Sequence, residues 1–390
     1  MQRSTSDRIL TTHTGSLPRA QDLLALLVAK DAHQDYDRAT FETRVREEVD
    51  RVVGEQIAAG IDVVNDGEQG KISFTGYRYD RLSGFEFVDP ASLGVGGGGG
   101  AVGEMADFPE FFQHLWQWGG GGQSGPPPPG ILACTQEIGW KDFSEVERDI
   151  ENLRAATSHV DPTEVFMTSI SPATYAPPNL HYDTEASYLD ALADAMAREY
   201  AAIVDAGFVL QIDAPDLTTL YRLNAITLEQ HHEALDLRVA AINRAVDGLD
   251  PERIRVHVCW GADEAPHHLD VPLKDIVRSL LKLRANGLVI PGANGRHSHE
   301  WRVWSDVGFP DEKVLVAGVI DSTTNIIEHP EAVAERLARY ASVVGPERVM
   351  GGVDCGFGTV AVVGQVDPRV MWAKFGSLAE GAALAPTYRL

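Results

Sequence analysis

The feature that most limits the fold is a regular alternation of apolar segments with amphipathic ones after about residue 60. The apolar segments are four to eight residues long and rich in Val, Ile and Leu, as in strands buried on both faces of a parallel sheet. Most are followed by apolar residues at helical spacing, most clearly Leu189, Leu192, Met196, Tyr200 and Ile203. The predicted strands lie at 61–65, 130–134, 165–170, 208–213, 254–259, 287–290, 314–321 and 349–354.

Eight such strands in a chain of 390 residues predict one (β/α)8 barrel domain over residues 1–390, which includes an N-terminal extension. A doubly wound open sheet is the alternative, but no glycine-rich phosphate-binding turn follows the first strand. Runs of glycine and proline between 94 and 130 predict a long flexible insertion within the barrel. A plain surface loop is favoured there over a lid above a site.

The charge of the chain excludes some classes of partner. A formal net charge of −24 repels phosphate backbones, so nucleic acid is not expected as a partner. No apolar run is long enough to cross a bilayer, so no membrane partner is expected. Three cysteines and a polar N-terminus without a signal peptide favour a reducing compartment, the cytoplasm.

Two of the three cysteines lie at the ends of predicted strands. Residues i and i+2 of a strand point to the same side, so His257 and Cys259 can face one point. A His-x-Cys pair alone is more often a core histidine beside a small apolar cysteine. Cys355, at the end of a distant strand, adds a second sulfur, and this set suits zinc with one position open for a substrate. Cys134 lies in the middle of an apolar run and is predicted to be a buried structural thiol.

Other polar residues follow the predicted strands directly. In a barrel the loops after the strands share one rim, which would collect Glu68, Asp213, Asp216, Arg296 and Asp321. The carboxylates would hold a cationic group of a substrate, or would instead cap helices and pair with arginines. Zinc bound by two thiolates and an imidazole favours alkyl transfer to a thiol, whereas water activation is better served by histidine-rich sets.

These residues lie in motifs that resemble those of the cobalamin-independent methionine synthases, specifically their C-terminal catalytic barrel. The resemblance covers nearly the whole chain and is nearest to the short, single-barrel branch. That branch is also similar to the epoxyalkane:coenzyme M transferases. The motifs are Thr14–Arg19, Asp66–Glu68, Gln211–Asp216, His257–Cys259, Ala293–Trp301, Glu328–Pro330 and Asp354–Gly356.

The resemblance implies that His257, Cys259 and Cys355 bind zinc. It further implies roles for seven other residues. Gly15 and Ser16 would hold the carboxylate of homocysteine, Glu68 and Asp213 would hold its amine, and Asp216 and Arg296 would also bind substrate. Asp321 and Glu68 would be the catalytic residues.

The chain departs from the family pattern at two positions. Pro291 follows a strand where the family has a further zinc-binding glutamate, so Glu300, His297 or His299 would substitute, or zinc would have three protein ligands. Thr323 stands where the synthases have a histidine thought to protonate the folate leaving group. This second departure argues against methyltetrahydrofolate as the donor.

The expected function is therefore that of a zinc-dependent S-methyl or S-alkyltransferase, which takes a small-molecule thiol, first of all homocysteine, and an alkyl donor. Thiol addition to an epoxide is an alternative within the same chemistry. A zinc-free barrel decarboxylase or lyase similar to uroporphyrinogen decarboxylase is a second alternative. A binding protein without activity is a third.

Overall fold

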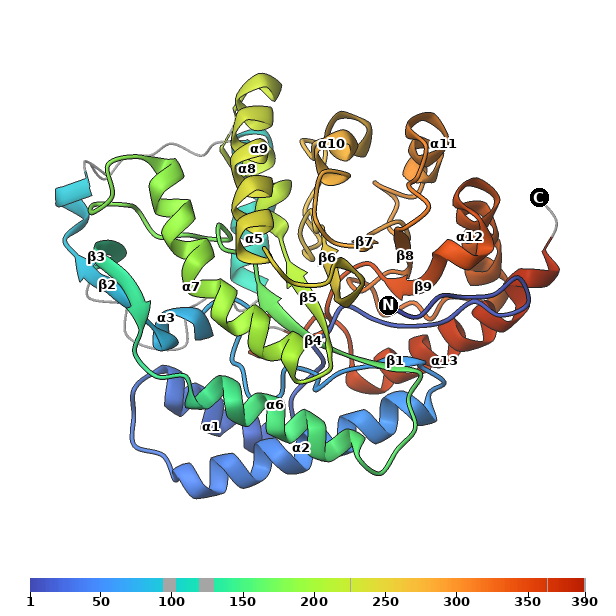
Figure 1. The fold of residues 1–390 in the computed structure, drawn as a ribbon, viewed down its shortest axis with the longest axis horizontal. Helices are drawn as coiled ribbons and strands as arrows, with labels where there is room; N and C mark the ends of the chain where they lie inside the picture. Colours follow the sequence, from blue (N-terminus) through green and yellow to red (C-terminus); the bar gives the residue numbers. More distant parts are fainter. Residues whose placement is uncertain (94–102, 119–129, 225, 363, 389–390) are drawn as a thin grey trace.

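The computed structural model describes residues 1–390 apart from 94–102, 119–129, 225, 363 and 389–390 (Figure 1). Within the described residues, seven strands form one curled sheet in the order β1-β4-β5-β6-β7-β8-β9, and every neighbouring pair is parallel. The predicted barrel of strands and helices is confirmed. The strands are β1 (Val63–Val64), β4 (Glu164–Ile170), β5 (Val209–Asp213), β6 (Ile254–His257), β7 (Gly287–Ile290), β8 (Val314–Ile320) and β9 (Val349–Val353).

The N-terminal segment occupies the eighth position of the barrel. Thr11 forms a parallel bridge with Gly351 of β9, and the backbone N–H of Thr12 donates to the Gly351 carbonyl at 2.8 Å. On its other side, the backbone N–H of Val63 in β1 donates to the Thr11 carbonyl at 3.0 Å. Residues 10–12 thus close the sheet between its first and last strands.

The prediction of a barrel strand at 130–134 is wrong. Gly130 directly precedes β3 (Ile131–Trp140), and residues 131–134 are its first part. This strand pairs antiparallel with β2 (Leu82–Val88) in a separate two-stranded sheet at the side of the barrel (Figure 1). A short apolar run looks the same in either setting. Most side chains of β3 are only partly buried or exposed, as expected of a strand that is covered on one face.

Helices surround the barrel strands (Figure 1). The amphipathic face predicted before Gly207 is confirmed, because its five apolar residues are all buried in α7. Thr184 begins this helix with a capping box, in which its side chain accepts from the Ser187 N–H. The α-helices among the described residues are α1 (Gln21–Asp31), α2 (Arg38–Ala58), α3 (Tyr77–Arg81), α4 (Glu104–Asp107), α5 (Pro109–Trp118), α6 (Ser144–Thr157), α7 (Glu185–Asp205), α8 (Thr219–Asn224), α9 (Leu228–Ala245), α10 (Leu273–Leu280), α11 (Val303–Val307), α12 (Pro330–Val344) and α13 (Pro368–Leu384).

Side chains fill the inside of the barrel up to the carboxyl ends of the strands. A small apolar cluster inside the sheet includes Leu10, Val63, Phe166 and Met350. Arg255 lies against it, with its guanidinium 3.7 Å from the centre of the Phe166 ring. Because this interior is packed, the space for a ligand lies at the carboxyl ends of the strands.

The predicted insertion at 94–130 lies largely outside the described residues, which include only 103–118 and Gly130 of it. In the described part, Glu104 of α4 accepts from the Arg222 guanidinium of α8 at 2.8 Å. No helix among the described residues is both long and apolar enough to cross a membrane.

Candidate metal centre

The three side chains of the predicted metal set meet at the carboxyl end of the sheet. His257 is the last residue of β6, Cys259 follows two residues later, and Cys355 lies two residues beyond β9. Their ligating atoms all lie within 4.8 Å of one another, and the two sulfurs are 3.4 Å apart. Two strands separate β6 from β9, so the curvature of the sheet brings the set together. These three buried residues are called the His-Cys-Cys group below.

The two ring nitrogens of His257 have different surroundings. Nδ1 lies 3.0 Å from the Asp213 carboxylate, which also accepts from the Gln211 amide at 2.8 Å. Nε2 is buried and has no hydrogen-bond partner among the described residues. An imidazole held in this way presents Nε2 as a ligand. One nitrogen and two sulfurs are a donor set that zinc binds in proteins, so the residues present fit this metal.

The charges in the group are strongly coupled. Burial lowers the pKa of His257, but the nearby Asp213 carboxylate and Cys259 sulfur outweigh it and raise the pKa to about 10. The Cys355 thiol lowers the pKa of Cys259 well below its usual value, and His257 adds to this effect. The same contact raises the pKa of Cys355. A divalent cation would displace the protons of the imidazolium and the thiol, because metal ligands bind in their deprotonated forms.

A cavity of about 320 Å³ adjoins the sulfurs. Its polar wall contains buried side-chain oxygens that no described residue hydrogen-bonds, which indicates that a polar ligand completes them. Phe74, Tyr175, Trp260 and Phe357 form much of its apolar wall. The oxygens without a hydrogen bond are Thr14 Oγ1, Ser16 Oγ, Glu68 Oε2 and Ser322 Oγ. Glu68 Oε2 also forms an ion pair with Arg19 at 3.8 Å.

Glu68 is held in the cavity wall in a strained conformation. Its φ is 54°, in the left-handed region that non-glycine residues adopt rarely and that is common at functional sites. Thr168 Oγ1 donates to one carboxylate oxygen at 2.7 Å. Burial raises the pKa of Glu68; the charge of Lys71 opposes this, and that of Asp213 adds to it. A ligand cation near Glu68 and Asp213 would relieve their repulsion.

The turn at Gly15 and Ser16 brings the N-terminal segment to the same wall. Gly15 has a φ of 118°, and a Cβ added there would lie 2.4 Å from Thr168 Cγ2. Only glycine therefore fits this close approach to β4. The turn lets Ser16 line the cavity with its hydroxyl free.

Asp216 lies apart from the cavity beside the sulfurs. Its carboxylate accepts from the hydroxyls of Ser171 and Thr174, and it lines a second cavity of about 440 Å³ together with Arg238. Burial raises the pKa of Asp216. The two cavities share Tyr175 and Thr219 as wall residues.

Asp321 and Arg296 line a third cavity of about 270 Å³. This cavity meets the first at Cys355, Trp260 and Ser322, among other shared residues. Asp321 accepts from the Thr323 hydroxyl at 2.7 Å. Thr323 is the residue that stands where the family resemblance predicts a histidine.

No residue expected to replace the zinc-binding glutamate of the family belongs to the His-Cys-Cys group found among the described residues. The residues considered for this role are Glu300, His297 and His299. His297 and Glu300 bond each other at 2.8 Å, and His297 also contacts Asp270 at 2.9 Å. His299 is exposed. Cys134 is buried in β3, as predicted, and takes no part in the group either.

Sequence reasoning missed several residues of this site. Trp260 was available as the immediate neighbour of Cys259. Thr14 lies beside the predicted Gly15 turn. Tyr175, Arg222 and Ser322 line the cavity with no signal in the sequence, because the positions of loops and of the short helix α8 place them there. Tyr175, like Glu68, has a positive φ, of 45°.

Comparisons with known proteins agree with the family resemblance that the sequence motifs indicate. The family described as cobalamin-independent synthase, catalytic domain, matches residues 9–93, which contain Gly15, Ser16 and Glu68. A methionine synthase of Sulfolobus acidocaldarius is 25% identical over 351 residues, covering 89% of this chain and 85% of that protein. The resemblance to the cobalamin-independent methionine synthases is confirmed.

Two further likenesses are informative. A B12-independent methionine synthase from Shewanella sp. W3-18-1, solved in complex with selenomethionine, has a TM-score of 0.69 and 18% identity, covering 97% of this chain and 98% of that one. At this identity the likeness to a methionine synthase shows the fold alone. A 2-hydroxypropyl-CoM lyase of Xanthobacter autotrophicus is 28% identical over 229 residues, 52% of this chain and 57% of that protein.

Proposed function

We propose that this protein is a zinc-dependent thiol alkyltransferase, which transfers a methyl or other alkyl group to homocysteine. The observation that carries the proposal is the His-Cys-Cys group, with an unpartnered His257 Nε2, on a cavity whose wall also contains Glu68 and Asp213. Bound zinc would supply an open coordination position at which a thiol loses its proton near neutral pH yet stays nucleophilic. The similarity to methionine synthases supports a methyl group as the group transferred.

The cavity wall favours a thiol that also carries an amino acid head group. In our proposal, Glu68 and Asp213 bind the ammonium of homocysteine, since two nearby buried carboxylates favour a cation between them. The hydroxyls of Thr14 and Ser16 donate to its carboxylate, which gives both unpartnered groups a partner. Asp213 also holds the His257 ring in place, so one carboxylate serves both the metal ligand and the substrate.

The donor would occupy the third cavity, where Asp321 and Arg296 line the wall. That cavity meets the first at Cys355, so a thiol sulfur bound near the two cysteines can reach a carbon placed there. The new sulfur–carbon bond forms as the carbon's bond to its leaving atom breaks, and the leaving atom takes that electron pair.

Free cysteines are in keeping with our proposal of a cytoplasmic location.

A second candidate is thiol addition to an epoxide. The similarity to the 2-hydroxypropyl-CoM lyase favours it, as does Thr323 in the position of the synthase histidine. Coenzyme M has no amine, however, and would bring no ligand cation to Glu68 and Asp213.

The test compares three cysteine variants. C259S and C355S should lose stoichiometric zinc and thiol alkylation, whereas C134S, which changes a buried cysteine outside the group, should keep both. Cobalt-substituted protein should show a change in its thiolate absorption at lower concentrations of homocysteine than of coenzyme M. Full turnover by a metal-free C259S/C355S double variant would end the proposal, and the reverse thiol preference would favour the epoxide reaction.

A further inference from the structure

A buried arginine outside the predicted site contacts the backbone next to Cys259. The Nη1 of Arg222 donates to the Trp260 carbonyl at 3.0 Å. Its Nε donates to Glu104 at 2.8 Å, and its Nη2 donates to Asp263 at 2.9 Å. The guanidinium is thus held by an element of the insertion on one side and by the loop after Cys259 on the other.

The contacted carbonyl belongs to a peptide group that also binds the sulfur. The backbone N–H of Gly261 donates to Cys259 Sγ at 3.3 Å. The Trp260 carbonyl and the Gly261 N–H are the two ends of one planar peptide group. Arg222 therefore binds the oxygen of the same group whose N–H bonds Cys259. A cation at the oxygen polarises the peptide and makes its N–H a stronger donor.

The surrounding contacts hold this peptide in one orientation. The Trp260 indole N–H donates to the Val271 carbonyl at 2.7 Å, and its ring packs on His297 with 4.6 Å between ring centres. Gly261 has a φ of 116°, and a Cβ there would lie 2.9 Å from Arg222 Nη1. A side chain at this position would therefore push the arginine away from the carbonyl.

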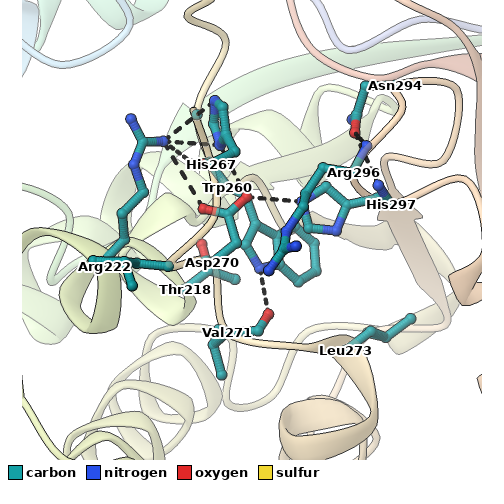
Figure 2. Close-up of polar contacts among 12 residues, drawn as sticks. Thr218, Arg222, Trp260, His267, Asp270, Val271, Leu273, Asn294, Arg296 and His297 are labelled. Atoms are coloured by element: carbon teal, nitrogen blue, oxygen red, sulfur yellow. Dashed lines mark hydrogen bonds and ion pairs between the residues drawn. The ribbon is translucent and has the colours of Figure 1, made fainter. Parts of the chain in front are cut away.

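The charge on Arg222 is secured by several carboxylates. Figure 2 shows its guanidinium beside His267 and Asp270, with His297 on the far side of Asp270. The nearest Arg222–Asp270 nitrogen–oxygen distance is 4.0 Å. Burial lowers the pKa of Arg222, but Asp263, Glu104 and Asp270 together raise it above its ordinary value. The cation is therefore a permanent feature of this peptide's surroundings.

We infer that Arg222 is a positioning residue of the His-Cys-Cys group, which orients and polarises the Trp260–Gly261 peptide so that its N–H draws electron density from the Cys259 sulfur. The inference rests on the proposed function, because it takes Cys259 as a metal ligand. A thiolate that accepts a hydrogen bond from an N–H gives less charge to a metal. The metal therefore stays a stronger Lewis acid toward an incoming thiol.

The test uses cobalt alone as the probe, in R222Q and in R238Q as a matched control. Arg238 is also a buried arginine, but it donates to the Ala234 carbonyl and Glu185 and lines the second cavity instead. In R222Q we expect the thiolate-to-cobalt absorption to move to longer wavelength, because a sulfur without a polarised donor loses its electron more easily. Metal affinity, from competition with a chelator, should fall about tenfold, because the loop that carries Cys259 loses its fixed orientation and this outweighs the stronger donation of a thiolate without the polarised N–H. R238Q should match the wild type in both.

R222K provides the second variant if R222Q does not fold. Lysine keeps the charge but lacks the planar fork that spans Glu104, Trp260 and Asp263, so a smaller shift in the same direction is expected. The inference is overturned if the absorption band of R222Q matches that of R238Q. If only R222K folds, its band is compared with that of R238Q instead. If the wild type shows no thiolate–cobalt absorption at all, the proposed function fails instead.

Discussion

Asp213 and His257 lie opposite each other in the register of β5 and β6, and Asp213 Oδ1 is 3.0 Å from His257 Nδ1. Strand pairing therefore sets this contact directly. Gln211, two residues before Asp213 on the same face of β5, donates to the same carboxylate oxygen at 2.8 Å and itself accepts from Arg255 at 2.8 Å. The packed interior of the barrel is thus linked by hydrogen bonds to the imidazole that we propose as a metal ligand.

Replacing this carboxylate should weaken metal binding. In D213N the His257 ring loses its charged partner, so we expect zinc affinity to fall about 10- to 100-fold in a chelator competition. D216N is the matched control, since Asp216 is also buried but bonds Ser171 and Thr174 outside the group. Equal zinc affinity in D213N and D216N would contradict the role given to Asp213.

Glu68 should discriminate thiols by their amine. In E68Q the loss of a charge-assisted bond should weaken homocysteine binding about tenfold, measured by titrating cobalt-substituted protein. Coenzyme M has no amine, so its binding should not change. E55Q, at a half-buried position of α2 outside the cavity wall, serves as the control variant. If E68Q weakens both thiols alike, Glu68 acts on the site in general and not on an ammonium.

The Gly15 turn should be intolerant of a side chain. G15A places a Cβ 2.4 Å from Thr168 Cγ2 at a φ of 118°. The backbone strain alone should lower the free energy of unfolding by about 1–3 kcal/mol, and the steric overlap should add to this loss. G54A is the opposite case, because that glycine lies inside α2 with nothing within 4 Å of the added Cβ. There we expect a gain of about 0.5–1 kcal/mol. Thermal unfolding of the two variants should move in opposite directions from the wild type.

Stability should depend on pH through His297. Burial lowers its pKa, but hydrogen bonds to Asp270 and Glu300 outweigh this and raise it to about 9. A pKa raised in the folded state adds stability that is complete below about 6.5 and is lost as the pH rises through about 9. The free energy of unfolding should therefore fall across this interval. H297Q should lack that component, so urea unfolding of both proteins at pH 6 and pH 9 should show the difference between them narrowing as the pH rises. A constant difference would contradict the protonated state of His297.

The predicted metal ligands could be found from the sequence because each follows a strongly apolar strand. Strand alternation alone predicts that His257 and Cys259 point the same way, and Cys355, like Cys259, lies two residues beyond the end of a strand. The strand count was less secure, because 130–134 is a short apolar run, whereas Leu10, Thr11 and Thr12 include only one apolar residue. Their pairing partners, β2 and the β9–β1 gap, are remote in the chain and leave no local signal.

The sequence by itself therefore determined the class of fold and the chemical type of the site, since both depend on periodicity and on which side chains end the strands. The tertiary structure alone decided that Asp216 faces a different cavity, that His297 and Glu300 bond each other, and that Arg222 reaches the peptide beside Cys259. Those outcomes depend on where loops of different strands come to lie. Loop positions follow from the packing of the whole barrel and not from the residues next to them.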